Sequence, residues 1–115
     1  SLLNKKSAIG VVSVCACDHS PLWANNLPSD DNLGRFIKEE NQNLRSQDLG
    51  LFYRINGAIY IFKSSVVIKH GGLVYTDKTF AYLMTRERSV DIDEQLDFDF
   101  AEFLIHRSKF KTNGR

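Results

Sequence analysis

A ten-residue apolar run near the start of the chain restricts the possible folds more than any other feature. Residues 8–17 read AIGVVSVCAC, a run rich in valine in which apolar and polar positions do not alternate. This pattern is typical of a strand that is buried on both faces, as in a parallel sheet. Because a sheet covered on both faces needs helices, the run predicts an α/β fold.

Shorter patterns predict the remaining elements. Further strands are expected at 57–63 and 79–84, the first of them preceded by a turn at Ile55-Asn56. Helices are expected at 64–70, before a glycine stop at Gly71-Gly72, and at 94–107. Apolar side chains recur at helical spacing in the second helix: Leu96, Phe100, Phe103 and Leu104. The polar tail from Lys109 onward is expected to be frayed.

Residues 18–50 differ in character, because proline, asparagine, aspartate and glycine interrupt short apolar pieces. Such a segment is expected to form loops, with a short hairpin as an option. A polar excursion of this length within a small domain is usually functional, either as a lid or as an arm that packs on another subunit. Its expected anchors are four apolar residues: Trp23, Leu33, Phe36 and Ile37.

The composition limits the classes of function. The 115 residues, 43% apolar and 25% charged, fit one compact domain spanning 1–115. A net charge of +1 provides no broad basic field, which argues against nucleic acid or a membrane surface as a partner. No apolar run approaches the roughly 20 residues of a membrane span. Cys15 and Cys17 are expected to be free thiols, because a disulfide between them would be strained, and free thiols suit a reducing cytoplasm.

Asp91 and Asp93 form the first candidate site. One residue separates them, so in an extended backbone both carboxylates project to the same side. Two such oxygens could reach one hard cation, and Mg²⁺ prefers one or two carboxylates together with substrate phosphates. The alternative is that Asp93 only caps the following helix and that Asp91 is a solvated loop residue.

The second candidate site lies around the sequence NGAIYI at 56–61. Asn56 and Gly57 place a small, flexible turn before a buried strand, where the amide of Asn56 could meet a ligand and Tyr60 could supply an aromatic wall. A turn residue and a packed tyrosine explain the same pattern. Arg45 and Arg54 could each hold a carboxylate or phosphate in a forked contact, although surface arginines are usually only solvated.

Four segments, taken in order, resemble the acylneuraminate cytidylyltransferases, also called CMP-sialic acid synthetases. The resemblance covers nearly the whole chain, about residues 8–105. NGAIYI is the most characteristic match, and its order and spacing relative to the segment at 89–97 argue against chance similarity. The segments are SVCACDHSP at 13–21, LRSQDLGLFYR at 44–54, NGAIYI at 56–61 and SVDIDEQLD at 89–97. Three positions depart from the family pattern: Ser46 replaces an arginine, and Gly50 and Ile55 each replace a proline.

The resemblance implies a role for each candidate residue. Asp91 and Asp93 would be the catalytic pair that holds Mg²⁺, which would bridge the triphosphate of CTP. The acidic sugar would meet arginines and a pocket wall formed by the remaining candidates: Arg45, Arg54, Asn56, Tyr60 and Tyr75. The implied reaction is attack of the sugar's anomeric hydroxyl on the α-phosphate of CTP, which releases pyrophosphate and forms a CMP-sugar.

The resemblance also implies an architecture. The expected fold is part of a Rossmann-like three-layer nucleotide-diphospho-sugar transferase domain, in which 1–115 is the carboxyl-terminal half and 18–48 is a dimerisation arm of a homodimer. The family's Gly-rich basic nucleotide loop is not found in the 115 residues, so we expect this segment alone to be inactive. Two alternatives remain open: a non-catalytic dimerisation or sugar-binding module, and a cytidylyltransferase for a related sugar such as pseudaminate, legionaminate or 3-deoxy-manno-octulosonate.

Overall fold

The computed structural model describes the backbone of residues 7–113 and the side chains of residues 7–109. The chain divides into two compact units. The first consists of the chain up to Cys15 together with the residues from Ile55 onward, and the second is Ala16–Arg54.

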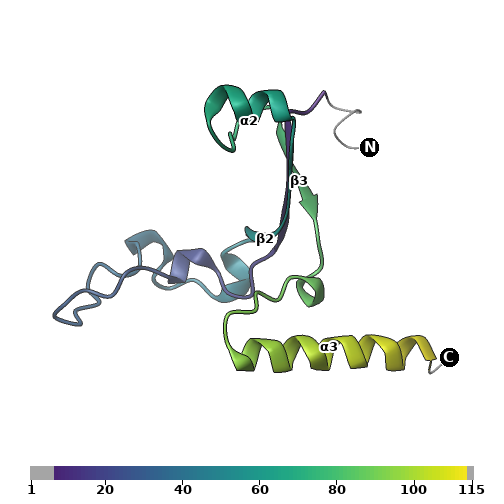
Figure 1. Ribbon diagram of the computed structural model, residues 1–115. Helices are drawn as coiled ribbons and strands as arrows, with labels where there is room; N and C mark the ends of the chain where they lie inside the picture. The colour runs from purple at the N-terminus through teal and green to yellow at the C-terminus, as the bar shows by residue number, and fades with distance from the viewer. Residues whose placement is uncertain (1–6, 114–115) are drawn as a thin grey trace. The chain divides into compact units, whose positions relative to one another are not determined.

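Three strands form a mixed sheet in the order β2-β1-β3, which Figure 1 shows edge-on. Their bounds are Gly10–Ala16 for β1, Tyr53–Phe62 for β2 and Thr79–Leu83 for β3. The predicted α/β class is therefore confirmed, with each of the three predicted strands present.

The two edge strands pair with β1 in opposite senses. Strand β3 is parallel to β1, and Ser13 lies opposite Tyr82 in the register. Strand β2 runs the other way, since Lys63 N donates to Ile9 O over 2.9 Å at the start of β1 and Cys17 N donates to Phe52 O over 2.8 Å beyond its end. The parallel sheet expected from the apolar run thus holds for β1 and β3 only.

Strand β1 carries most of the core. The buried apolar residues of the described chain are Ala8, Val11, Val12, Cys15 and Leu49. Four of these five belong to the predicted 8–17 run, which confirms that a central strand buries residues on successive positions and therefore on both faces. The strand is shorter than the run, because it begins at Gly10 and ends at Ala16.

The turn predicted at Ile55-Asn56 is wrong. Both residues lie inside β2, which begins at Tyr53. Gly57 has a φ of +74°, a conformation that side chains other than glycine rarely adopt. The positive φ of Gly57 is accommodated within the continuous strand, whereas the sequence pattern of a polar residue followed by glycine is more typical of a turn.

Helix α2 (Ser64–His70) is confirmed with the predicted bounds. It ends at Gly71 in the left-handed conformation, with a φ of +71°, and Gly72 N donates to Val67 O over 3.2 Å. This is the glycine stop expected from the sequence, because glycine adopts a positive φ without steric cost and so terminates the helix.

Helix α3 (Gln95–Asn113) is longer than predicted. The predicted helix end at residue 107 is wrong, because the helix continues to residue 113 and neither glycine nor proline interrupts 95–113; the last two residues lie outside the described chain. Three of its expected core residues are more than half exposed: Leu96, Phe100 and Phe103. Across the described residues, no helix has both the length and the apolar character needed to cross a membrane.

The second unit, Ala16–Arg54, consists mainly of loops, as predicted. Its regular structure before β2 is limited to three single turns of 3₁₀-helix, at Pro21–Trp23, Glu39–Asn41 and Ser46–Asp48. The optional hairpin is not among the elements of this described segment. Two of its expected anchors, Trp23 and Leu33, are exposed within the chain.

Candidate functional site

The candidate site begins at the carboxyl ends of the two parallel strands. Because β1 and β3 are parallel, these ends lie at one edge of the sheet, and Met84 N donates to Val14 O over 2.8 Å just beyond β3. The chain that leaves β3 at this edge continues through a 3₁₀ turn (Arg86–Arg88) to Asp91 and Asp93. Ligands of open α/β sheets usually bind at this edge. The two aspartates therefore follow a strand whose carboxyl end lies where a ligand is expected.

A buried hydrogen bond joins the two sequence motifs of the candidate site. The side-chain amide of Asn56 in β2 donates through Nδ2 to Ser89 Oγ over 3.0 Å, and both residues are buried. Ser89 opens the segment SVDID and stands two residues before Asp91. The sequence NGAIYI therefore contacts the segment that carries the paired aspartates, although 33 positions separate Asn56 from Ser89.

Ser13 of β1 completes this contact from the centre of the sheet. Its hydroxyl is fully buried and donates to Asn56 Oδ1 over 2.5 Å, while Ile59 N donates to Ser13 Oγ over 2.8 Å. A buried serine in an apolar strand needs such partners, because an unpaired hydroxyl there is costly. The serine thus connects the two strands by side-chain as well as backbone hydrogen bonds.

The segment is also held at its other end, by Asp97 in the first turn of α3. The carboxylate of Asp97 accepts from Asp93 N over 3.1 Å and from Glu94 N over 3.0 Å. A carboxylate in this place satisfies backbone donors of the helix start and interacts favourably with the helix dipole. The residue predicted to cap α3 was Asp93, whereas the observed side-chain contact comes from Asp97.

Asp91 and Asp93 therefore lie on a short segment that hydrogen bonds fix on both sides, and both residues are exposed. Among the described residues, no three His, Cys, Asp or Glu side chains gather closely enough to form a complete metal site. Two exposed carboxylates still match the needs of Mg²⁺, which usually takes one or two carboxylates and completes its shell with phosphate oxygens and water. The donor set thus fits a metal that arrives with a nucleotide.

The two tyrosines occupy different parts of the sheet. Tyr60 lies in β2 four residues after Asn56 and is 45% exposed. Tyr75 precedes β3, and its ring packs edge-on against Phe62 with 6.4 Å between ring centroids. Phe62 is six residues from Asn56 along β2, a separation of up to about 20 Å at roughly 3.3 Å per residue. The structure therefore does not bring Tyr75 to the sheet edge of Asn56 and the aspartates.

The two arginines belong to the second unit. The guanidinium of Arg45 donates through Nε to Asp48 Oδ2 over 3.3 Å, and Arg45 N donates to the same oxygen over 3.2 Å. Its side chain is 74% exposed, so most of its donors face solvent. Arg54 is an exposed residue near the start of β2.

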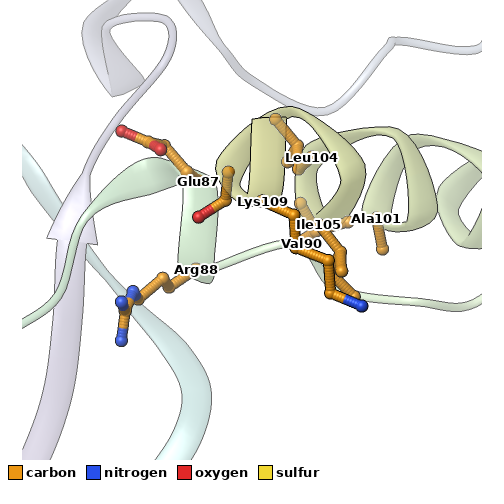
Figure 2. Close-up of a pocket in the computed structure, with 8 residues that line it drawn as sticks. Glu87, Arg88, Val90, Ala101, Leu104, Ile105 and Lys109 are labelled. Carbon is orange, nitrogen blue, oxygen red and sulfur yellow. The ribbon is translucent and has the colours of Figure 1, made fainter. Parts of the chain in front are cut away.

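An open cavity of about 540 Å³ lies between α3 and the segment that precedes it (Figure 2). Its apolar wall comes from Val90 together with Ala101, Leu104 and Ile105 of the helix, and in Figure 2 the side chains of Glu87 and Arg88 extend away from α3. None of the seven predicted site residues lines this cavity, although Val90 lies between Ser89 and Asp91 in the chain.

Sequence reasoning did not single out Ser13, Ser89 or Asp97 as functional residues. Ser13 had a usable signal, because it is a hydroxyl in the middle of an otherwise apolar run. Asp97 had one as well, since an acidic residue in the first turn of a helix is a common partner of backbone donors. No local pattern identifies Ser89, because its partner is distant in the chain.

Comparison with known proteins finds several relatives, whereas no family model matches the chain. The chain is 32% identical over 88 residues to an N-acylneuraminate cytidylyltransferase of Streptococcus agalactiae. The matched region covers 76% of the chain and 21% of that protein. It is 29% identical over 110 residues to a CMP-N,N'-diacetyllegionaminic acid synthase of Legionella pneumophila. This match covers 90% of the chain and 44% of that protein.

A third relative has a different name. The chain is 32% identical over 80 residues to the post-translational flagellin modification protein B of Campylobacter coli. The match covers 69% of the chain and 34% of that protein. The chain thus spans less than half the length of each of these three relatives. The names of the first two relatives agree with the family that the motifs at 56–61 and 89–97 resemble, and the structure places these two motifs in contact. The chain therefore belongs to the acylneuraminate cytidylyltransferase family and matches the carboxyl-terminal region of its members.

Proposed function

We propose that the full-length protein containing this chain transfers CMP from CTP to an acidic sugar and releases pyrophosphate. The observation that carries the proposal is the hydrogen bond between Asn56 and Ser89, which ties the family's Asn-Gly motif to the segment with Asp91 and Asp93. The names of the relatives support the same reaction class. The domain would be Rossmann-like and three-layered, with 18–48 as the arm of a homodimer.

Asp91 and Asp93 would hold Mg²⁺ together with the phosphates of CTP. The bound metal would neutralise charge on the triphosphate, as divalent metals do in phosphoryl transfer generally. The protein's own contribution is positional, because Ser89 and Asp97 hold the segment at both ends and leave the two carboxylates exposed. Such preorganisation lowers the barrier without reorganisation at the moment of reaction.

The family resemblance assigns the remaining candidate residues to the acidic sugar. Arg45 and Arg54 would pair with its carboxylate, since guanidinium groups form forked contacts with carboxylates. Tyr60, nearly half exposed on β2, would offer an aromatic surface to the sugar. The sugar itself is either N-acetylneuraminate or a relative such as N,N'-diacetyllegionaminate, because relatives of both names match this chain.

The test is a pyrophosphate-release assay on the full-length protein with CTP, Mg²⁺ and a panel of acidic sugars. The panel holds N-acetylneuraminate, N,N'-diacetyllegionaminate, pseudaminate and 3-deoxy-manno-octulosonate. We expect turnover with at least one nine-carbon sugar, and a loss of about a hundredfold or more in Asp93→Asn, as for other removed electrostatic contacts.

Asp77→Asn is the matched control, because Asp77 is an exposed aspartate before β3, away from the carboxyl ends of the strands. It should retain full activity. Absence of turnover with every sugar of the panel would refute the proposed reaction. Full activity in Asp93→Asn and in Asp91→Asn would refute the metal role alone.

A further inference from the structure

A directed chain of hydrogen bonds runs from the sheet to the segment that carries the aspartates. It begins with the bond from Ile59 N to Ser13 Oγ, and continues from Ser13 to Asn56 and from Asn56 to Ser89. It ends where Ser89 Oγ donates to Thr85 O over 2.6 Å. Each hydroxyl accepts from the preceding group and donates to the next one, an arrangement in which neighbouring bonds polarise and strengthen each other.

The amide of Asn56 uses all of its hydrogen-bonding positions within the chain. Its Oδ1 accepts from Ser13 Oγ and from Ala58 N, the latter over 3.1 Å. Its Nδ2 donates to Ser89 Oγ and to Met84 Sδ, the latter over 3.4 Å. A side-chain amide has two acceptor positions and two donors, so none is left for the hydroxyl of a sugar.

The orientation of this amide follows from its surroundings. Ala58 N can only donate, so the atom that faces it must be the amide oxygen. The NH₂ group must then face Ser89 and the sulfur of Met84, which is an acceptor. Asn56 is also 9% exposed, so a ligand would have to displace bonds that are already formed in a buried site.

The bond from Asn56 acts on one side of the aspartate segment. Ser89 lies two residues before Asp91, and its hydroxyl closes the 3₁₀ turn at 86–88 through Thr85 O. On the other side, Asp97 holds the backbone N–H of Asp93. The two carboxylates are therefore displayed between two anchors, one on the sheet and one on α3.

We infer that Asn56, with Ser13 and Ser89, is a positioning residue for the carboxylates of Asp91 and Asp93 and does not contact the sugar. The inference rests on the proposed function, in which those carboxylates meet the metal and the nucleotide. It changes the role that family resemblance implied for Asn56, from a ligand of the substrate to a support of the metal-holding segment. Supports of this kind typically change metal affinity by about 10-fold to 100-fold when they are removed.

Three variants of the full-length protein test the inference. Ser89→Ala removes the link at the segment, and Ser13→Ala removes it in the sheet. Asn56→Asp keeps the acceptor for Ala58 N and removes both donors. Ser65→Ala is the matched control, because Ser65 is exposed on α2.

Two measurements need no turnover. The first is the binding of Mn²⁺ in the presence of CTP, measured by titration calorimetry. We expect its dissociation constant to rise about tenfold or more in Ser89→Ala and Asn56→Asp and to stay unchanged in Ser65→Ala. The second is hydrogen exchange, in which amides of residues 86–93 should exchange faster in the variants while those of β3 keep their protection.

Ser13→Ala provides a test from the far side of the network. Its effect on Mn²⁺ binding should have the same direction, and the double variant Ser13→Ala with Ser89→Ala should be less than additive, because both act through Asn56. If Asn56→Asp does not fold, the two serine variants still decide the question.

The inference is overturned if Mn²⁺ binding and the exchange of 86–93 are unchanged in the serine variants, or if wild-type protein binds no Mn²⁺. It is also overturned if Asn56→Asp raises only the KM of the sugar, since that result makes Asn56 a sugar ligand. Failure of the proposed function looks different, because wild-type protein would then bind Mn²⁺ but transfer CMP to none of the four sugars.

Discussion

The carboxylate of Asp97 accepts a hydrogen bond from Asp93 N over 3.1 Å, four residues back in the chain. The same oxygen accepts from Glu94 N, so one side chain satisfies two backbone donors where α3 begins. These donors would otherwise face solvent without a partner in the helix. The start of α3 and the backbone of a predicted metal ligand are therefore stabilised by the same carboxylate.

This relationship predicts that Asp97→Ala lowers the free energy of unfolding by about 1 kcal/mol, the usual cost of a lost cap. The amides of residues 93 and 94 should lose protection against hydrogen exchange, measured residue by residue by NMR. Glu102→Gln, an exposed change on the same helix, should alter neither quantity. Unchanged protection at 93 and 94 in Asp97→Ala would contradict the assignment.

The close approach of Gly10 to Phe62 makes a second prediction. A Cβ at residue 10 would overlap the ring of Phe62. Gly10→Ala should therefore destabilise the sheet by about 1–3 kcal/mol, as overpacked cores do. Chemical denaturation measures the effect, and a second change, Phe62→Leu, should recover part of the loss.

Gly72→Ala is the control for this position, because a Cβ there meets nothing within 4 Å and residue 72 has no positive φ. It should be close to neutral. A neutral Gly10→Ala would mean that the ring of Phe62 moves aside at little cost.

A third prediction concerns the positive φ of Gly57. Nothing lies within 4 Å of a Cβ at this position, so a substitution there tests only the backbone conformation. Gly57→Ala should cost roughly 1–2 kcal/mol, and Gly57→Asn should cost less, because asparagine tolerates the left-handed region. Urea unfolding gives both free energies of unfolding. Equal stability of the two variants would count against a positive φ at residue 57.

A fourth prediction concerns Arg45 and depends on the proposed reaction. Its ion pair with Asp48 is exposed, so Arg45→Met should change the free energy of unfolding by less than about 1 kcal/mol. If Arg45 pairs with the sugar carboxylate, the KM of the sugar should rise about tenfold while kcat stays within about twofold. Steady-state kinetics measures both, with Arg35→Met, another exposed arginine of the second unit, as the control.

Unchanged kinetics in Arg45→Met would remove this residue from the sugar site. A lower kcat with an unchanged KM would instead indicate that Arg45 makes an interaction only in the transition state.

Several features of this protein follow from its sequence alone. The buried strand around Val11 and Val12 and the stop of α2 at Gly71 depend on local chemistry, namely continuous apolarity and a residue free to adopt a positive φ. Family membership also came from ordered local motifs, which the relatives then supported. Features of this kind depend on residues that are close together in the sequence.

Tertiary structure decided the rest. Asn56 reads as a turn residue, yet it lies inside β2 and its amide meets Ser13 and Ser89, which are 43 and 33 positions away. Strand pairing brings these residues together, and no local pattern encodes which distant hydroxyl will satisfy a buried amide. Because a buried polar group must find partners wherever the fold supplies them, the supports of the aspartate segment became visible only in three dimensions.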